Sequence, residues 1–226
     1  MSRRMRGTVL ALTVMTGWFL LAGLAWAGEE IGDGQNNHNA PYLRMGVGAR
    51  ALGMGGAFAG VANDLTAGYW NPAGLAWTSG WQIGGMYSSG LEVDRKYNHV
   101  GLSKSWTMGA VGFNWLNSGM TDIDWYGEQG QPLGTGDFAD NAFMLSLAKR
   151  FDIVSLGLTG KYLRQSIDAT VPGDDAITGY GLDLGMGLSL SEMFRFGVTV
   201  QDIAGSLGDE DDANDIPTNL RAGVAV

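Results

Sequence analysis

Residues 178–190 read TGYGLDLGMGLSL, and apolar side chains occupy every second position of this stretch. The apolar positions are Tyr180, Leu182, Leu184, Met186, Leu188 and Leu190. Glycine, aspartate or serine stands at each position between them. Successive side chains of a strand point to opposite faces, so this alternation predicts a β-strand with one apolar face and one small or polar face.

The same period of two recurs between residue 79 and the last residue. Clear copies occupy 154–162, 194–201 and 219–226, and weaker copies occupy 80–88, 97–105, 108–117 and 141–150. Short turns are expected near 105–108, 150–153 and 190–193, and longer polar loops at 89–96, 118–140, 165–177 and 203–217. The pattern therefore predicts eight antiparallel strands with short turns at one end and long loops at the other.

This asymmetry of turns and loops is typical of transmembrane β-barrels, in which the apolar face contacts lipid and the polar face lines the lumen. Aromatic residues are expected to form two belts at the membrane interfaces. The belt at the short-turn end contains Trp81, Trp106 and Phe194, and the belt at the long-loop end contains Tyr87, Tyr97, Trp115, Phe143, Tyr162 and Tyr180. A soluble exported β-sandwich that works as a binding module explains the alternation equally well, but it explains neither the belts nor the loop asymmetry.

The composition excludes several classes of protein. The chain has no cysteine, so it forms neither a disulfide framework nor a thiolate metal site. Glycine contributes 37 of 226 residues, well above the usual share of about 7%. These glycines lie within apolar, aromatic-bearing segments, where glycine marks a bend or the close approach of another backbone.

The first 27 residues are predicted to be a cleaved signal peptide. Arg3, Arg4 and Arg6 precede an apolar run over 10–24, and residues 25–27 read AWA, a small-x-small cleavage site. An uncleaved membrane anchor is the alternative. Cleavage removes three arginines and no acid, leaving 11 basic residues against 23 acidic ones and a formal charge of −12. Such a surface argues against nucleic acid as a partner.

Residues 48–76 read GARALGMGGAFAGVANDLTAGYWNPAGLA. The stretch GVGARA at 46–51 matches a dinucleotide-binding pattern, but no buried strand precedes it, and GMGG at 53–56 lacks the Lys-Ser/Thr of a phosphate-binding loop. A segment with so few large side chains is suited to lie inside a barrel, with its backbone close to the wall. Asn71-Pro72 favours a turn, and Asn63 or Asp64 is placed to cap a short helix over 65–70.

The same stretch resembles the N-terminal signature of PorV/PorQ-type outer-membrane proteins, within the superfamily of FadL-type long-chain fatty-acid channels. The resemblance is sharp over 44–76, and a weaker likeness covers 198–226. It implies a fourteen-stranded transmembrane barrel whose N-terminal segment forms a lumenal hatch. The residues that carry the hatch motif are Arg50, Gly53, Gly55, Gly56, Asn63, Asp64, Asn71 and Pro72.

The resemblance also implies where the protein works and with which partners. Outer-membrane lipid and lipopolysaccharide would surround the barrel. PorV-type members handle cargo of the type IX secretion system, whereas FadL-type members take up hydrophobic small molecules. We therefore expect a non-enzymatic protein of the cell outer membrane, with protein secretion as its function and FadL-type uptake as the alternative.

The chain holds eight predicted strands, fewer than the fourteen that the resemblance implies. An eight-stranded barrel is only wide enough for its own side chains, so it has no room for a hatch of some fifty residues. We expect an incomplete, curved sheet with 80–88 and 218–226 as unpaired edges and 44–76 against its concave face. The expected organisation is a signal peptide over 1–27, a hatch over 28–78 and barrel strands over 79–226.

The sequence offers little for catalysis. The two histidines, His38 and His99, stand near no nucleophile motif. The acidic run at 209–212 lacks the spacing of a calcium loop, so we expect neither a metal nor a cofactor. The charged residues expected to point into the lumen are Arg50, Lys161, Asp183, Arg195 and Arg221.

Overall fold

The computed structural model describes residues 39–89, 94–127, 129–169, 176–191, 193–208 and 214–226. Four short helices come first: η1 (Pro41–Arg44), α2 (Ala49–Gly53), α3 (Ala67–Trp70) and η2 (Pro72–Trp77). The rest of the described chain is almost entirely antiparallel β-structure. Within it, no helix is both long and apolar enough to cross a membrane.

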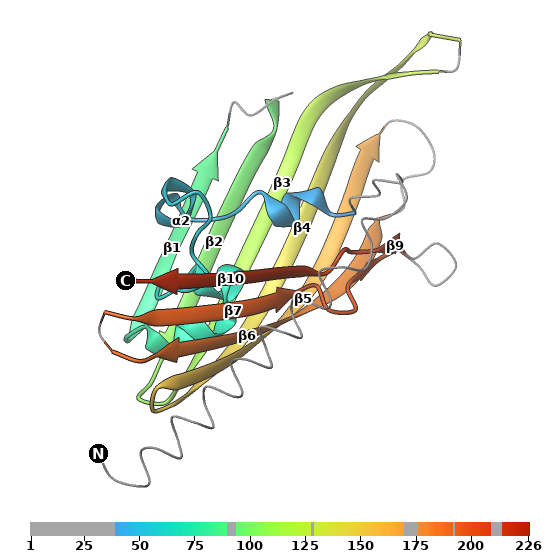
Figure 1. Cartoon of the computed structure of the whole chain (residues 1–226). Coiled ribbons are helices and arrows are strands. Elements are labelled where there is room, and N and C mark those ends of the chain that lie inside the picture. The colour runs from blue at the N-terminus through green and yellow to red at the C-terminus, as the bar shows by residue number, and fades with distance from the viewer. Residues whose placement is uncertain (1–38, 90–93, 128, 170–175, 192, 209–213) are drawn as a thin grey trace, which may run out of the picture. The chain divides into compact units, whose positions relative to one another are not determined.

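Eight strands form one curled sheet, as the alternation predicts (Figure 1). Their bounds are β1 (Trp81–Ser88), β2 (Lys96–Ser105), β3 (Gly109–Tyr126), β4 (Pro132–Phe151), β5 (Val154–Ala169), β6 (Ile177–Ser189), β7 (Arg195–Gln201) and β10 (Asn219–Ala225). Each strand pairs with the next along the chain, and β7 pairs with β10. Two-residue strands β8 (Ser206–Leu207) and β9 (Asn214–Asp215) add a short extension beside β6.

The sheet is open, because among the described residues its two edge strands, β1 and β10, do not pair with each other. This agrees with the expectation of a curved, incomplete sheet. The curl brings β6, β7 and β10 across from β1 to β4 (Figure 1). The sheet therefore has an inner face, which these two groups of strands share, and an outer face.

The faces carry the opposite chemistry to that of a water-soluble sheet. Leu182 and Leu184 on β6 are 39% and 48% exposed on the outer face, whereas Asp183 between them is fully buried on the inner face. Buried polar residues of the inner face recur on β2 to β7; they are His99, Ser103, Asn114, Ser118, Ser146, Ser155, Thr159, Lys161, Asp183, Thr199 and Gln201. The predicted orientation of the alternation is confirmed.

The predicted loop at 118–140 is wrong. Strands β3 and β4 continue into it as a hairpin that reaches Tyr126 and restarts at Pro132, with a register shift between Met120 and Ile123 (Figure 1). This hairpin carries polar residues on both faces, so it lacks the apolar alternation that marks the other strands. Strand β5 likewise extends to Ala169, beyond the predicted start of a loop at 165.

Most residues of the predicted aromatic belts lie on the outer face. Trp81, Trp106, Tyr87 and Tyr180 are all more than half exposed. Tyr97 is the exception: it is buried on the inner face of β2, where its hydroxyl donates a hydrogen bond to the Tyr42 carbonyl (3.0 Å). Tyr97 shares the parity of the buried residues of β2, and this parity excludes it from a belt.

Candidate functional site

Residues 39–78, here called the inner segment, lie against the inner face of the curled sheet. Helix η2 packs on β4, β5 and β6, and α3 packs on β3 and β4. In Figure 1 the segment runs between β1–β4 and the layer formed by β7 and β10. The expected position of 44–76 on the concave face thus agrees with these contacts. Residues 28–38 of the predicted hatch lie outside the described part of the chain.

Glycines of the wall allow the inner segment to approach the strands backbone to backbone. A side chain at Gly157 of β5 would overlap the Ala73 amide, and one at Gly197 of β7 would overlap the Ala59 carbonyl. On β10, a Cβ at Gly223 would lie 2.8 Å from the Gly60 nitrogen. Further glycines that face the segment stand on β1, β2, β3 and β6, namely Gly84, Gly101, Gly112 and Gly185. This close approach explains the glycine content of the strands.

Asn71 fastens the segment to the wall. Its side-chain nitrogen donates to the carbonyls of Ala59 (2.9 Å) and Met186 (3.1 Å), and its oxygen accepts from the Ala73 amide (3.2 Å). The last contact caps η2, which begins at Pro72, so the predicted Asn-Pro turn is confirmed. Further hydrogen bonds join the segment to the wall: Gln201 donates to the Tyr69 carbonyl (2.6 Å), Thr159 to the Gly68 carbonyl (3.0 Å) and the Trp77 indole to Ser155 (2.8 Å).

Aromatic residues form the core of the inner segment itself. Tyr69 donates to the Leu43 carbonyl (2.7 Å) and accepts from the Gly46 amide (3.0 Å), while the Trp70 indole donates to the Val47 carbonyl (2.8 Å). Burial raises the pKa of the Tyr69 hydroxyl, so Tyr69 stays neutral and serves as a hydrogen-bonding bridge between two turns of the segment.

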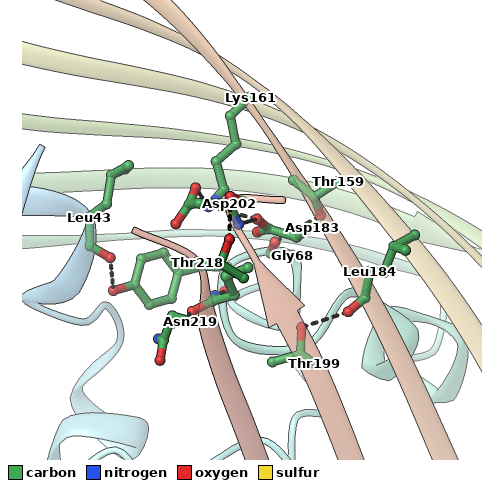
Figure 2. Close-up of polar contacts among 12 residues, drawn as sticks. Leu43, Gly68, Thr159, Lys161, Asp183, Leu184, Thr199, Asp202, Thr218 and Asn219 are labelled. Carbon is green, nitrogen blue, oxygen red and sulfur yellow. Dashed lines mark hydrogen bonds and ion pairs between the residues drawn. The ribbon is translucent and has the colours of Figure 1, made fainter. Parts of the chain in front are cut away.

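A buried ionic network joins the inner segment to three strands (Figure 2). Lys161 of β5 contacts Asp183 of β6 (2.8 Å) and Asp202 (2.7 Å), which directly follows β7. Asp202 also pairs with Arg44 of η1 (2.9 Å), and its backbone amide donates to Asp183 (2.9 Å). Two cations and two anions make the network neutral, which a buried group of charges requires.

Strand register brings this network together. Lys161 is opposite Gly181 and Asp183 is opposite Thr159, so the two charges are diagonal neighbours on the inner face. Asp202 has a left-handed backbone (φ 57°), which turns the chain back over β6 after β7 ends. Among the predicted lumen residues, Lys161 and Asp183 are thus brought together. The sequence analysis missed Arg44 and Asp202, and the only signal for Asp202 is an acid at the end of an alternating strand.

The predicted residues of the hatch motif divide into two groups. Asn71 and Pro72 are buried under the sheet, whereas Arg50 and Gly53 lie on the exposed part of α2. The expectation that Arg50 points into the lumen is wrong: its side chain is half exposed and binds within the segment. Its guanidinium donates to Asn63 (2.6 Å) and lies 3.6 Å from Asp64. Asp64 in turn accepts hydrogen bonds from the amide (2.9 Å) and hydroxyl of Thr66, immediately before α3.

The two remaining predicted lumen arginines occupy different surroundings. Arg195 lines a narrow space beside Trp77, near the start of β7. Arg221 of β10 stacks on the inner segment, with its guanidinium carbon 4.7 Å from the centre of the Trp70 ring. Gly55 and Gly56 follow α2 with positive φ and, together with Arg44 and Arg221, line a second, larger cavity.

The described residues contain no cluster of three or more metal-ligating side chains. His99 is buried and shares a hydrogen bond with Asn114 (2.8 Å), which gives it a structural partner. His38 and the acidic run at 209–212 lie outside the described residues. The arrangement is suited to hold a segment in place and not to catalyse a reaction, because the buried charges neutralise each other.

Comparison with known proteins does not assign the chain to a family. No protein-family model matches it, and a search of curated proteins finds no relative. The PorV/PorQ resemblance of residues 44–76 therefore remains an expectation. The function is inferred from the residues and from the geometry described above.

Replacing Lys161 by Met tests the ionic network. We expect the free energy of unfolding to fall by about 3–5 kcal/mol, because two buried carboxylates then lose the cation that they share. Urea unfolding in detergent micelles, followed by tryptophan fluorescence, measures the change. Lys149→Met is the matched control, since Lys149 is exposed over the Phe151 ring, and it should cost at most about 1 kcal/mol. Equal losses in the two variants would contradict a stabilising role for the network.

A pair of glycine substitutions tests the close approach of the inner segment. Gly157→Ala should destabilise the fold by about 1–3 kcal/mol, because the added methyl group overlaps the backbone at Ala73. Gly160→Ala, three residues along the same strand, meets nothing within 4 Å and should change stability by no more than about 0.5 kcal/mol. The same unfolding assay compares the two, and a Gly157→Ala variant as stable as Gly160→Ala would show that the segment does not sit on this wall.

Proposed function

We propose that the chain forms the wall and hatch of an outer-membrane β-barrel of PorV/PorQ type, which serves protein secretion at the cell surface. The observation that carries the proposal is the inverted burial of the sheet. Apolar residues cover the exposed outer face, and charged and polar residues are buried inside. No other feature of the described chain separates a membrane wall from a soluble sheet as clearly.

The outer face matches the surroundings that a bilayer provides. Its exposed apolar side chains extend over the central strands and include Val100, Leu102, Phe113, Leu145, Leu147, Leu156, Leu158, Leu182 and Leu184. A contiguous apolar surface of this kind is rare on a soluble monomer and marks a contact with lipid or a partner. The exposed aromatics near both strand ends support lipid, because transmembrane barrels carry such girdles at the two interfaces.

The inner segment supports the role of a lumenal hatch. It covers the polar face of the wall, and its Asn71 and Arg44 are bound to residues far along the chain. A hatch held by hydrogen bonds and a neutral ionic network stays in place without a greasy core. In this proposal, cargo proteins or secretion-system components meet the barrel on its long-loop side, where the β3–β4 hairpin extends.

Arginine substitutions at two depths test the membrane assignment. Leu184→Arg should destabilise the protein in a bilayer by about 2–4 kcal/mol, because Leu184 is placed near the midplane. Leu190→Arg, at the end of β6 near the interface, should cost about 0–1 kcal/mol. Both leucines are about half exposed, at 48% and 51%, so a soluble sheet would tolerate the two changes equally. Equal stabilities in reconstituted vesicles would therefore contradict a transmembrane wall.

Deletion of the coding sequence in the producing organism tests secretion against uptake. We expect the deletion to deplete exported proteins from the cell surface, while uptake of a fluorescent long-chain fatty acid stays unchanged. Quantitative surface proteomics and an uptake assay measure the two effects, and re-expression of the intact chain provides the control. Loss of fatty-acid uptake with a normal surface proteome would contradict the secretion role and favour the FadL-type alternative.

A further inference from the structure

The inner segment and β10 enclose a cavity of about 420 Å³ that the ionic network does not fill. Arg44, Met45, Leu52, Gly55, Trp70 and Arg221 line it. Small-molecule sites in proteins range over about 300–1,000 Å³ and combine apolar walls with a few placed polar groups. The size and the mixed lining of this cavity fit that description.

The charge of the cavity is positive. Arg44 is balanced within the neutral network through Asp202, whereas no described carboxylate lies within ion-pair distance of Arg221. Arg221 therefore adds an uncompensated cation to a chain whose formal net charge is −9. Arg44 also offers a donor: its Nη1 is buried without a partner in the described part of the chain. Guanidinium groups with free donors favour oxyanions, which they bind by charge-assisted hydrogen bonds.

The remainder of the lining is apolar. Leu52 is 43% exposed although it lies against the cavity, and the Trp70 ring and the partly buried Met45 form the adjoining wall. Gly55 has a left-handed backbone (φ +63°), and a Cβ there would meet nothing within 4 Å. The absent side chain leaves the cavity open at this point. A ligand that fits these surroundings carries an oxyanion at one end and an apolar group at the other.

We propose that this cavity binds an organic anion, with Arg221 and Arg44 holding the carboxylate or another oxyanion and with Leu52, Met45 and Trp70 contacting the apolar part. The site depends on the packing of the inner segment against β10. It goes beyond the secretion role, and it holds for the folded chain in either secretion or uptake.

Paired substitutions at Gly55 test the site without altering its arginines. Asp and Asn both tolerate a left-handed backbone, and they differ mainly in charge. Gly55→Asp places a carboxylate beside the arginines and should weaken decanoate binding at least about tenfold relative to Gly55→Asn. Isothermal titration of the full chain, held in an amphipathic polymer instead of detergent, measures both affinities. Equal affinities in the two variants would overturn the proposal.

Probes of other charge define the ligand class. Decyltrimethylammonium should not compete with decanoate, and inorganic phosphate should compete at least about tenfold more weakly, because it lacks the apolar part. Arg221→Gln should weaken decanoate binding, while Arg195→Gln, an inner-face arginine outside the cavity, should not. Unfolding curves show whether the variants remain folded. Competition by the cation, or equal competition by phosphate, would overturn the assignment of an organic anion.

Discussion

Backbone-to-backbone contact between the inner segment and the strands is the constraint on which the rest of the structure depends. The segment touches the wall at Gly157, Gly197 and Gly223, where a single added carbon would overlap its main chain. Such contact removes water from polar backbone groups, so they need partners. Asn71, Thr159 and Gln201 supply some of them. Small residues on one face thereby leave the large apolar residues to the other face.

The ionic network follows from the same geometry. A wall of small residues leaves space for Lys161 and Asp183 to point inward, and the turn at Asp202 adds a second acid. Arg44 completes the charge balance from the inner segment, so the segment is joined to β5 and β6 by electrostatics as well as by packing. Each member is buried mainly because the others are present, since an unpaired charge there would be costly.

The alternation of residues 178–190 was sufficient to predict strands, their antiparallel order and the face of each side chain. It placed Lys161 and Asp183 on the inner face because register depends on parity alone. Parity does not report what lies above a face, so the contacts of Gly185 and Gly157 with the inner segment could not be predicted. The pairing of Arg44 with Asp202 joins positions far apart in sequence, and the β3–β4 hairpin has no apolar face to detect. These features depend on tertiary contacts.

The central claim is that the outer face contacts lipid while the inner segment is sealed from both lipid and water. Methyl NMR of the protein in lipid nanodiscs tests it directly, with a nitroxide on the lipid chains and, separately, a water-soluble gadolinium chelate. The account predicts that the nitroxide broadens the methyl signals of Leu182 and Leu184, and that neither agent broadens those of Leu43 and Leu75, which are buried in the inner segment. Broadening of Leu182 and Leu184 by the gadolinium chelate, or of Leu75 by either agent, would contradict the account.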